Sequence, residues 1–327
     1  MIHNIIRQYN LIVLALLILL TSCNISKEDN KGELEGRISI SGAFALYPLV
    51  VKWGNEFQKL HPNVKVDITA GGAGKGIADA LHGNVNLGMV SRDVAIEEIN
   101  QGAWGITVAR DAVLATTSST NPNLEILSKR GITREEFNKI WITQEIKTWD
   151  DLLKNGSTHP IIKYKRSDAA GAAQTWAKFF DKTQDDLSGI GVFGDPGLAL
   201  AVSKDKYSLG FNNIAYVYDL RTQKPYDGLA VIPIDFNGNG TIDSTENFYN
   251  SHQELVNAIA YNQYPSPPGR ELYFISHGPP KDKLVIEFFK WVLTDGQKYV
   301  PEMGYIKLSH LKTEAELEML EKLIVTQ

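Results

Sequence analysis

The feature that most constrains the fold of this chain is a strand, a loop of small residues and a helix that follow one another along the sequence. Residues 37–41 (RISIS) alternate as a half-buried strand does, and apolar residues from Leu46 to Leu60 then recur at helical spacing. Residues 64–68 (VKVDI) lead into a glycine-rich loop, and residues 161–166 (IIKYKR) lead into a loop rich in alanine. This order predicts an α/β fold with a parallel sheet.

The loops after these strands occupy residues 41–46, 69–76 and 166–172. In α/β sheets, ligands bind at the carboxyl ends of strands, where helix N-termini present unpaired backbone N–H groups and a partial positive charge. The second loop looks like a nucleotide phosphate loop, but that motif needs a glycine at position 69 and a Ser or Thr at position 76. Thr69 and Gly76 stand there instead. We therefore expect this loop to hold an oxyanion without nucleotide or magnesium.

The N-terminal residues indicate export. Arg7 precedes about ten apolar residues, a stretch too short to cross a membrane. Residues 20–23 (LTSC) resemble a bacterial lipobox, whose cysteine becomes acylated, and Cys23 is the single cysteine of the chain. Residues 1–22 are therefore predicted to be a lipoprotein signal peptide, and residues 23–33 a flexible tether. The alternative is an ordinary export signal followed by an unmodified thiol.

Export would place the folded body outside the cytoplasm, anchored through lipid to a bacterial membrane on its periplasmic side or at the cell surface. Without Arg7 the chain carries 32 basic and 38 acidic residues, a net charge of −6. This balance argues against nucleic acid as a partner, and a bound anion would have to be held by local geometry. The roughly 300 remaining residues are enough for two domains of ordinary size.

Five segments, in order along the chain, resemble the phosphate-type solute-binding proteins of ABC importers. They are SGAFALYPLVVKW at 41–53, AGGAGKGIADAL at 70–81 followed by NLGMVSRD at 86–93, YKRSDAAGAAQTW at 164–176, SLGFNNIAYV at 208–217 and FFKWVLTDGQKYVPEMGYIKL at 288–308. The resemblance covers nearly all of the mature chain and implies a monomer with a type II periplasmic-binding fold. It places lobe 1 at 34–109 plus 229–327 and lobe 2 at 110–228, joined by a hinge that the chain crosses twice.

The resemblance also implies an anion site made by loops of both lobes. The matching positions are Ala43, Phe44, Ala45, Ala73, Gly74, Ser91, Arg92, Asp93, Arg166, Asp168, Ala170, Gly171 and Ala172. The family typically has Ser or Thr hydroxyls in three of these loops, where this chain has Phe44, Ala73, Ala170 and Ala172. Each lost hydroxyl would remove about 1 kcal/mol of net binding free energy. Backbone N–H groups and Arg166 would remain as donors.

Arg166 is the leading candidate of this set, because a guanidinium presents a fork of donors that matches two oxyanion oxygens. Asp168 could hold that fork in place, although a surface Arg–Asp pair is the alternative. The family uses an aspartate near residues 91–93 to accept the proton of phosphate. Because Arg92 stands in this stretch, the alignment of this chain with the family is ambiguous there by one residue. Lys75 is expected to extend into solvent, and Phe44 could equally be a core residue under its loop.

Residues 235–246 (DFNGNGTIDSTE) match a calcium-binding loop. The expected ligands are Asp235, Asn237, Asn239, the Thr241 carbonyl, Asp243 and Glu246. Gly240 occupies the sharp turn, and Ile242 occupies the hydrophobic eighth position. Because a strand precedes the loop, the site would be structural, and bound calcium would stiffen the chain as far as a helix expected at about 247–260. An Asn/Gly-rich surface turn is the alternative.

The expected function is that of an extracytoplasmic lipoprotein that captures a small oxyanion, phosphate foremost, between two lobes and delivers it to an ABC permease. Catalysis is not expected, because the seven histidines are scattered, without zinc spacing or a paired nucleophile. A second hypothesis is a signalling or structural protein on the same fold that binds a different small ligand. The missing hydroxyls favour that second hypothesis.

Overall fold

The computed structural model describes residues 33–325, and Glu35–Gln327 form a compact unit of their own. The predicted signal peptide, the lipidation site at Cys23 and nearly all of the tether lie outside the described residues. Among residues 33–325, no helix combines the length and the apolar character needed to cross a bilayer.

The strands form one large sheet and two small pairs. They are β1 (Gly36–Gly42), β2 (Val64–Ala70), β3 (Leu87–Val90), β4 (Ala103–Ser118), β5 (Ile132–Thr133), β6 (Ile162–Arg166), β7 (Ile190–Val192), β8 (Ser208–Asn213), β9 (Tyr218–Asp219), β10 (Lys224–Pro225), β11 (Leu229–Val231), β12 (Ile234–Asp235) and β13 (Gly269–His277).

The helices are α2 (Tyr47–Leu60), α3 (Ala73–Leu81), α4 (Ile96–Asn100), α5 (Leu124–Arg130), α6 (Arg134–Trp141), α7 (Trp149–Leu153), α8 (Gly171–Lys178), α9 (Asp195–Lys204), α10 (His252–Ala260), α11 (Lys283–Leu293), α12 (Tyr299–Glu302) and α13 (His310–Val325). Short 3-10 turns lie at Gln184–Asp186, Ile214–Tyr216 and Asp295–Lys298.

The strand order in the large sheet is β2-β1-β3-β13-β4-β8-β6-β7, with β11 also paired to β4. β1, β2 and β3 are parallel, and so are β8, β6 and β7. β4 connects these two parallel groups: its first part pairs antiparallel with β13, and residues Val113–Thr116 pair antiparallel with β8. The expected α/β fold with parallel strands is therefore present twice in the chain.

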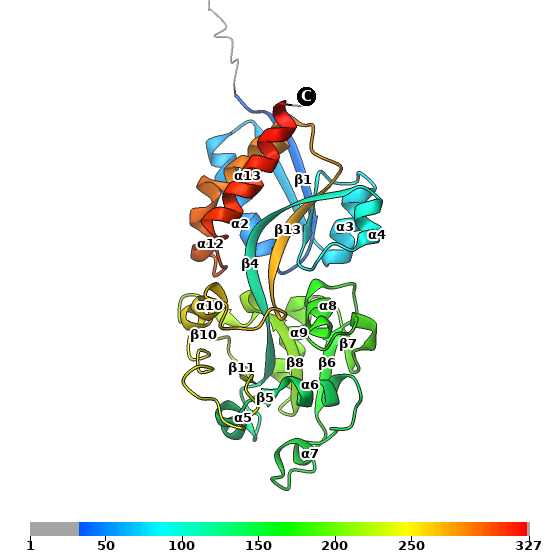
Figure 1. Ribbon diagram of the computed structural model, residues 1–327, viewed down its shortest axis with the longest axis vertical. Coiled ribbons are helices and arrows are strands. Elements are labelled where there is room, and N and C mark those ends of the chain that lie inside the picture. The colour runs from blue at the N-terminus through cyan, green and yellow to red at the C-terminus, as the bar shows by residue number, and fades with distance from the viewer. Residues whose placement is uncertain (1–32, 326–327) are drawn as a thin grey trace, which may run out of the picture. The chain divides into compact units, whose positions relative to one another are not determined.

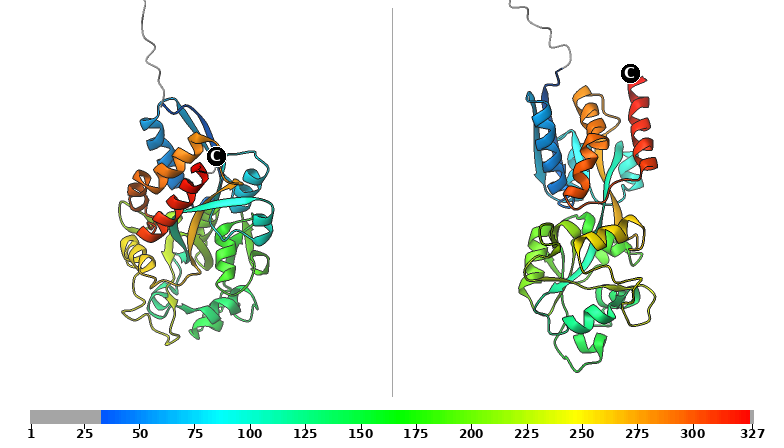
Figure 2. Two further views of the ribbon diagram at one scale, coloured as in Figure 1. Left: turned by 45° about the horizontal axis from the view of Figure 1, so that its top comes forward. Right: turned by 90° about the vertical axis from the view of Figure 1, so that its left-hand side faces the viewer.

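Two lobes follow from this topology, and β4 and β13 run between them (Figure 1). The first lobe contains β1 to β3, with α2 and α11 on one face of the strands and α3 on the other. The second lobe contains β6 to β8 with α8 and α9, and Figure 2 shows the same division from two further directions. Because β4 and β13 belong to both lobes, a change in their course would move one lobe against the other.

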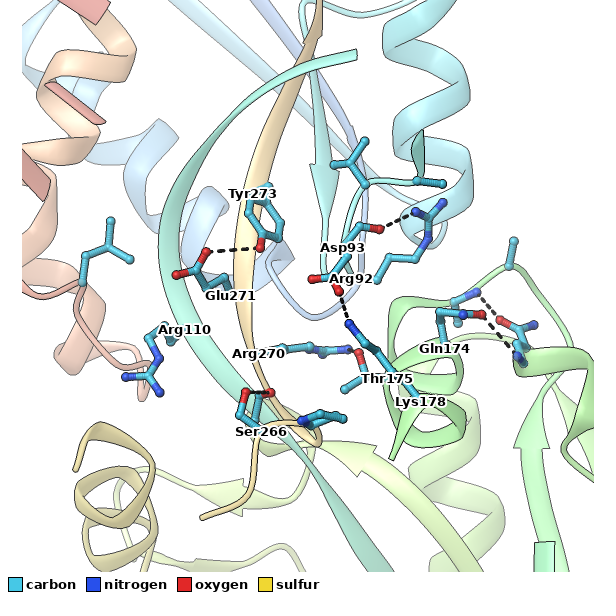
Figure 3. Close-up of a pocket in the computed structure, with 18 of the residues that line it drawn as sticks. Arg92, Asp93, Arg110, Gln174, Thr175, Lys178, Ser266, Arg270, Glu271 and Tyr273 are labelled. Carbon is cyan, nitrogen blue, oxygen red and sulfur yellow. Dashed lines mark hydrogen bonds and ion pairs between the residues drawn. The ribbon is translucent and has the colours of Figure 1, made fainter. Parts of the chain in front are cut away.

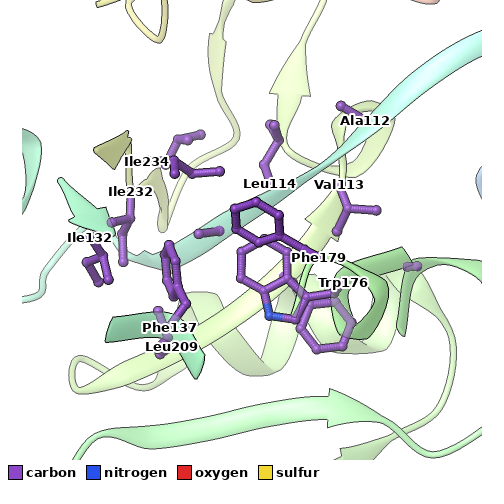
Figure 4. Packing of buried hydrophobic residues seen from close by; sticks show 14 of the residues in the cluster. Ala112, Val113, Leu114, Ile132, Phe137, Trp176, Phe179, Leu209, Ile232 and Ile234 are labelled. Atoms are coloured by element: carbon purple, nitrogen blue, oxygen red, sulfur yellow. The ribbon is translucent and has the colours of Figure 1, made fainter. Parts of the chain in front are cut away.

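Aromatic side chains fill the core of the second lobe (Figure 4). The Trp176 ring stacks on Phe211 at a centroid distance of 5.9 Å and meets Phe137 edge-on at 5.1 Å. In the first lobe, Trp53 is buried and donates its indole N–H to the Gly296 carbonyl at 2.8 Å. Each parallel group therefore has an aromatic centre against which its helices pack.

The boundary expected at residue 229 differs from the structure. Val231, Phe248, Leu255 and Tyr264 belong to the same buried cluster as Trp176, so residues after 229 still build the second lobe. The chain instead returns to the first lobe along β13. The expected helix at about 247–260 begins later, at His252, because the Ser251 hydroxyl caps it by accepting from the Glu254 N–H.

His252, at the start of α10, gives the second lobe a pH-sensitive contact. It is buried, and its Nε2 lies 3.0 Å from the Gly304 carbonyl oxygen. Burial lowers the pKa of His252, against the raising effect of the hydrogen bond to Gly304. The unfolded chain therefore takes up a proton at higher pH than the folded chain does, so this contribution to stability is complete above pH about 6.5 and declines below it.

We expect His252→Gln to flatten the dependence of the unfolding free energy on pH below about pH 6.5. Urea unfolding followed at several pH values measures this slope. His277→Gln, at an exposed histidine, is the control and should leave the slope as in the parent protein. An unchanged slope in His252→Gln would show that other groups produce the pH dependence.

Candidate functional site

The carboxyl ends of β1, β2 and β6 carry the three loops singled out in the sequence. β1 leads through Ala43–Leu46 into α2, β2 leads through two glycines into α3, and β6 leads into α8. The first two loops belong to the first lobe and the third belongs to the second. The structure brings them together between the lobes.

Glycines allow the loops to approach one another closely. A Cβ on Gly72, which has a φ of +91°, would lie 2.8 Å from Asp168 Oδ2, and one on Gly171 would lie 2.2 Å from Ser91 Oγ. The Gly74 N–H donates to the Ala169 carbonyl at 3.0 Å. These contacts join the first lobe to the second, so the lobes are closed at this point.

Backbone N–H groups without partners occur in the loops that meet between the lobes. The N–H groups of Phe44, Ala45, Ala73, Gly171 and Ala172 have no acceptor within residues 33–325. Three of them belong to the first turns of α3 and α8, whose N-caps are Gly72 and Ala170 and make no side-chain capping bond. Helix N-termini with unpaired N–H groups attract negative charge. We call these five groups the backbone cradle.

Ser91 adds a hydroxyl to the cradle. The residue follows β3, is 2% exposed, and its Oγ lies beside Gly171 at the start of α8. The hydroxyl has no hydrogen-bond partner among the described residues. A Ser Oγ both donates and accepts, so Ser91 could serve either an ionised or a protonated oxygen of a ligand.

Arg166, at the end of β6, is buried and held by two carboxylates. Its Nε donates to Asp168 Oδ1 at 2.8 Å, one terminal nitrogen donates to Asp168 Oδ2 at 2.5 Å, and the other donates to Asp195 Oδ2 at 2.5 Å. Only three of its five N–H groups are used in this way. The Phe44 ring lies 5.3 Å from the guanidinium carbon. Asp168 thus orients Arg166, as the sequence suggested.

Sequence reasoning missed Asp195, the residue that starts α9. It is fully buried and also accepts from Asn213 Nδ2 at 2.6 Å. Burial raises the pKa of Asp195, although Arg166 acts to lower it. Tyr216 was also missed, and its hydroxyl donates to the Phe44 carbonyl at 3.0 Å. Asn213 and Tyr216 lie within the segment SLGFNNIAYV, but nothing in their spacing indicated which residues they contact.

Arg92, Asp93 and Lys75 are directed to partners other than the cradle. The Arg92 fork binds the Glu98 carboxylate at 2.9 and 2.7 Å, and Asp93 forms an ion pair with Lys178 of the second lobe. Lys75 pairs with Asp79 and remains half exposed, in line with the expectation that it extends outward. Phe44 is only half-buried and packs edge-on against Phe193, at the surface of its loop.

A cleft of about 1170 Å³ opens between the lobes, and Ala170, the N-cap of α8, belongs to its lining (Figure 3). Of the predicted site residues, Arg92, Asp93 and Ala170 line it. Its most buried cation is Arg270, at the start of β13, which donates to Asp111 at 2.7 and 3.0 Å and to Thr175 Oγ1 at 3.2 Å. The charged walls of the cleft are largely neutralised in pairs, and none of the five cradle residues lines it.

Asn213 links Arg270 to the cradle. Its side-chain oxygen accepts from Arg270, and its side-chain nitrogen donates to Asp195, which binds Arg166. A continuous chain of buried polar groups therefore runs from the cradle to the two strands that cross between the lobes. We call it the buried polar chain; its members are Asp168, Arg166, Asp195, Asn213, Arg270 and Asp111.

Two α/β lobes that share crossing strands and enclose helix N-termini define a two-lobe ligand-binding protein. Residues 28–296 match the family model described as PBP superfamily domain, and the chain belongs to this family. The fold is the type II periplasmic-binding fold, as the sequence predicted. Members of this family are binding proteins rather than enzymes.

Curated relatives of this chain include two proteins named Phosphate-binding protein PstS. The one from Bacillus subtilis is 25% identical over 296 residues, which are 88% of each chain. The one from Pseudomonas aeruginosa is 26% identical over 312 residues, again 88% of each chain.

Solved structures show the same fold at low sequence identity. A putative phosphate ABC transporter substrate-binding protein from Clostridium perfringens, with bound phosphate, matches with a TM-score of 0.68 and 20% identity, covering 84% of this chain and all of that chain. An ABC-type phosphate transport receptor from Vibrio cholerae matches with a TM-score of 0.60 and 18% identity, covering 83% of this chain and all of that chain.

Removing one carboxylate of the buried polar chain should destabilise the protein. We expect Asp195→Asn to lower the unfolding free energy by roughly 1.5–3 kcal/mol, because it removes a charge-assisted hydrogen bond from buried Arg166 and leaves Asp168 as the one carboxylate of the pair. Urea unfolding at neutral pH measures the loss. Asp181→Asn removes a carboxylate that is 85% exposed and pairs with Arg134, so it should have little effect. Equal effects of the two substitutions would contradict a structural role for the buried polar chain.

Proposed function

We propose that this protein is an extracytoplasmic solute-binding lipoprotein that captures phosphate between its lobes and delivers it to an ABC importer. The backbone cradle is the observation that carries this proposal. Its N–H groups come from both lobes, and those of Ala73, Gly171 and Ala172 carry the partial positive charge of helix N-termini. Such donors fit the oxygens of a tetrahedral oxyanion without any metal.

Arg166 and Ser91 complete the proposed site. Arg166 supplies the positive charge with two N–H groups to spare, and its two carboxylates fix the direction of the fork. Ser91 supplies a hydroxyl from the first lobe, which compensates in part for the missing Ser and Thr side chains. Arg92 is directed to Glu98 and Asp93 to Lys178, so we assign them to the rim of the cleft.

Closure of the lobes around the ligand follows from where these groups lie. Phe44, Ala73 and Ser91 belong to the first lobe, whereas Arg166 and Gly171 belong to the second. An oxyanion that accepts from both sets favours the closed state, because only that state satisfies all of its oxygens. Bending of β4 and β13 would supply the motion. The relatives named phosphate-binding proteins support phosphate as the ligand.

The remaining parts of the proposal come from the sequence. Cys23 would carry the lipid that anchors the protein to a bacterial membrane, and an ABC permease would receive the ligand. A signalling or structural protein on this fold, with another small ligand, is the second candidate. It is favoured by the alanines at positions 73, 170 and 172, where hydroxyls are typical of the resembling family.

Calorimetric titration of the purified protein, unfolded and refolded to remove carried-over ligand, tests the function. We expect one phosphate per chain, no comparable binding of sulfate, and no hydrolysis of p-nitrophenyl phosphate. Arg166→Ala should weaken phosphate binding at least about tenfold, because a charge-assisted donor contributes roughly 1.5–3 kcal/mol. Ser91→Ala should weaken it by roughly fivefold, in line with about 1 kcal/mol for a neutral hydrogen bond.

Arg130→Ala is the matched control. Arg130 forms a comparable forked ion pair with Glu136, away from the cradle in the second lobe, so its loss should leave phosphate affinity unchanged. If neither phosphate nor sulfate binds to the protein, the second candidate function is favoured. Phosphate binding that Arg166→Ala and Ser91→Ala leave unaltered would place the site elsewhere.

A further inference from the structure

The segment between β12 and α10 contains a group of acidic and amide side chains that phosphate binding does not use. It runs over residues 235–246 and starts where β12 pairs in parallel with β5. Its middle is attached to the body of the second lobe, because the Ile242 N–H donates to the Lys129 carbonyl at 2.7 Å. We call this segment the acidic loop.

The acidic loop is folded around its own side-chain oxygens. The two carboxylate oxygens of Asp235 accept from the N–H groups of Gly238 and Gly240 at 2.7 and 2.9 Å. Asn237 Oδ1 accepts from the Asn239 N–H at 2.9 Å, and Asp243 Oδ1 accepts from the Thr245 N–H at 2.8 Å. The oxygens of Asp235 and Asn237 each accept one such bond and keep a lone pair for a cation. Asp243 is more fully used, because its Oδ1 also accepts from the Thr245 hydroxyl at 2.6 Å and its Oδ2 accepts from Asn237 Nδ2 at 3.0 Å.

Glu246 is the observation that points to a ligand. It is 2% exposed, and its Oε1 accepts from the N–H groups of Phe236 and Asn237 at 2.6 and 3.1 Å. These bonds direct the carboxylate into the loop. Its Oε2 is buried and has no hydrogen-bond partner among the described residues. A buried carboxylate oxygen without a partner is costly unless a cation or another donor satisfies it.

We infer that the acidic loop binds one calcium ion. The side-chain oxygens of Asp235, Asn237, Asn239, Asp243 and Glu246 and the carbonyl of Thr241 would supply its ligands. Calcium takes six to eight oxygens, and a terminal glutamate that offers two of them completes such a set. The unpartnered Oε2 of Glu246 would be the oxygen that the metal satisfies.

Carboxylates alone do not define this site. No three His, Cys, Asp or Glu side chains within residues 33–325 are grouped as a metal centre. The three carboxylates of the acidic loop are not grouped in this way either, so the inferred site depends equally on its amide and carbonyl oxygens. Such mixed oxygen sets suit calcium, whereas zinc prefers nitrogen and sulfur.

The acidic loop is packed against the part of the second lobe that supports the crossing strand. Phe236 stacks with Phe248 and meets Tyr264 edge-on. The Tyr264 hydroxyl in turn donates to the Val113 carbonyl of β4 at 2.8 Å. Calcium would therefore stabilise the second lobe beneath β4, without touching the phosphate ligand.

Titration of the full protein with CaCl₂, after treatment with EGTA and desalting, tests the inference. We expect one calcium ion per chain, a higher melting temperature with calcium, and at least about tenfold weaker binding of magnesium. Glu246→Gln should weaken calcium binding at least about tenfold, because it removes one charge and replaces a ligand oxygen by a donor. Asp243→Asn provides a second test at a less buried ligand, should Glu246→Gln fail to fold.

Asp227→Asn is the matched control, since it removes the same charge from an exposed position outside the acidic loop. It should bind calcium as the parent protein does. The inference is overturned if the parent protein shows neither calcium heats nor a melting shift at millimolar CaCl₂, or if Glu246→Gln and Asp243→Asn bind calcium as the parent does. Phosphate titration of the same samples is independent of either result.

Discussion

The buried ion pair between Arg166 and Asp195 is the interaction on which the rest of the site depends. A guanidinium inside a protein loses its hydration and must be matched by carboxylates and hydrogen bonds. Asp168 and Asp195 accept hydrogen bonds from Arg166. Asn213 connects Asp195 to Arg270, which in turn binds Asp111. The loop that starts α8 is therefore fixed to the strands that join the lobes. In the function that we propose, ligand capture and lobe closure would therefore involve the same set of groups.

In the function that we propose, the cradle would allow a protein with a net negative charge to attract an anion. Its donors are backbone N–H groups at helix starts, which carry partial charge that no side chain has to supply. Glycines at 72 and 171 allow the two lobes to meet there, because any side chain at either position would collide with the opposite lobe. The small residues of these loops thus serve close approach, and alanine in place of Ser or Thr keeps that approach possible.

The second lobe owes its size to residues late in the chain. Val231, Phe248 and Tyr264 pack with Trp176, so the lobe is completed only after the chain has passed through the acidic loop. A calcium ion in that loop would act on the same core from its edge. The two binding sites that we propose therefore have different roles: one responds to the transported solute, and the other would stabilise the lobe that holds it.

The sequence by itself determined the α/β class, the positions of the three loops and the pairing of Arg166 with Asp168. The periodicity of apolar residues, the glycine content of a loop and a separation of two residues are all local properties of the chain. It also indicated the acidic loop, since calcium ligands lie at fixed intervals along one segment. Only the tertiary structure decided that Asp195 and Asn213 join Arg166, that Arg92 is directed to Glu98, and that the second lobe extends past residue 229. Those contacts join residues that are distant in sequence, or they form where a side chain has several possible partners. Which partner a side chain contacts is fixed only when the whole chain has folded and packed.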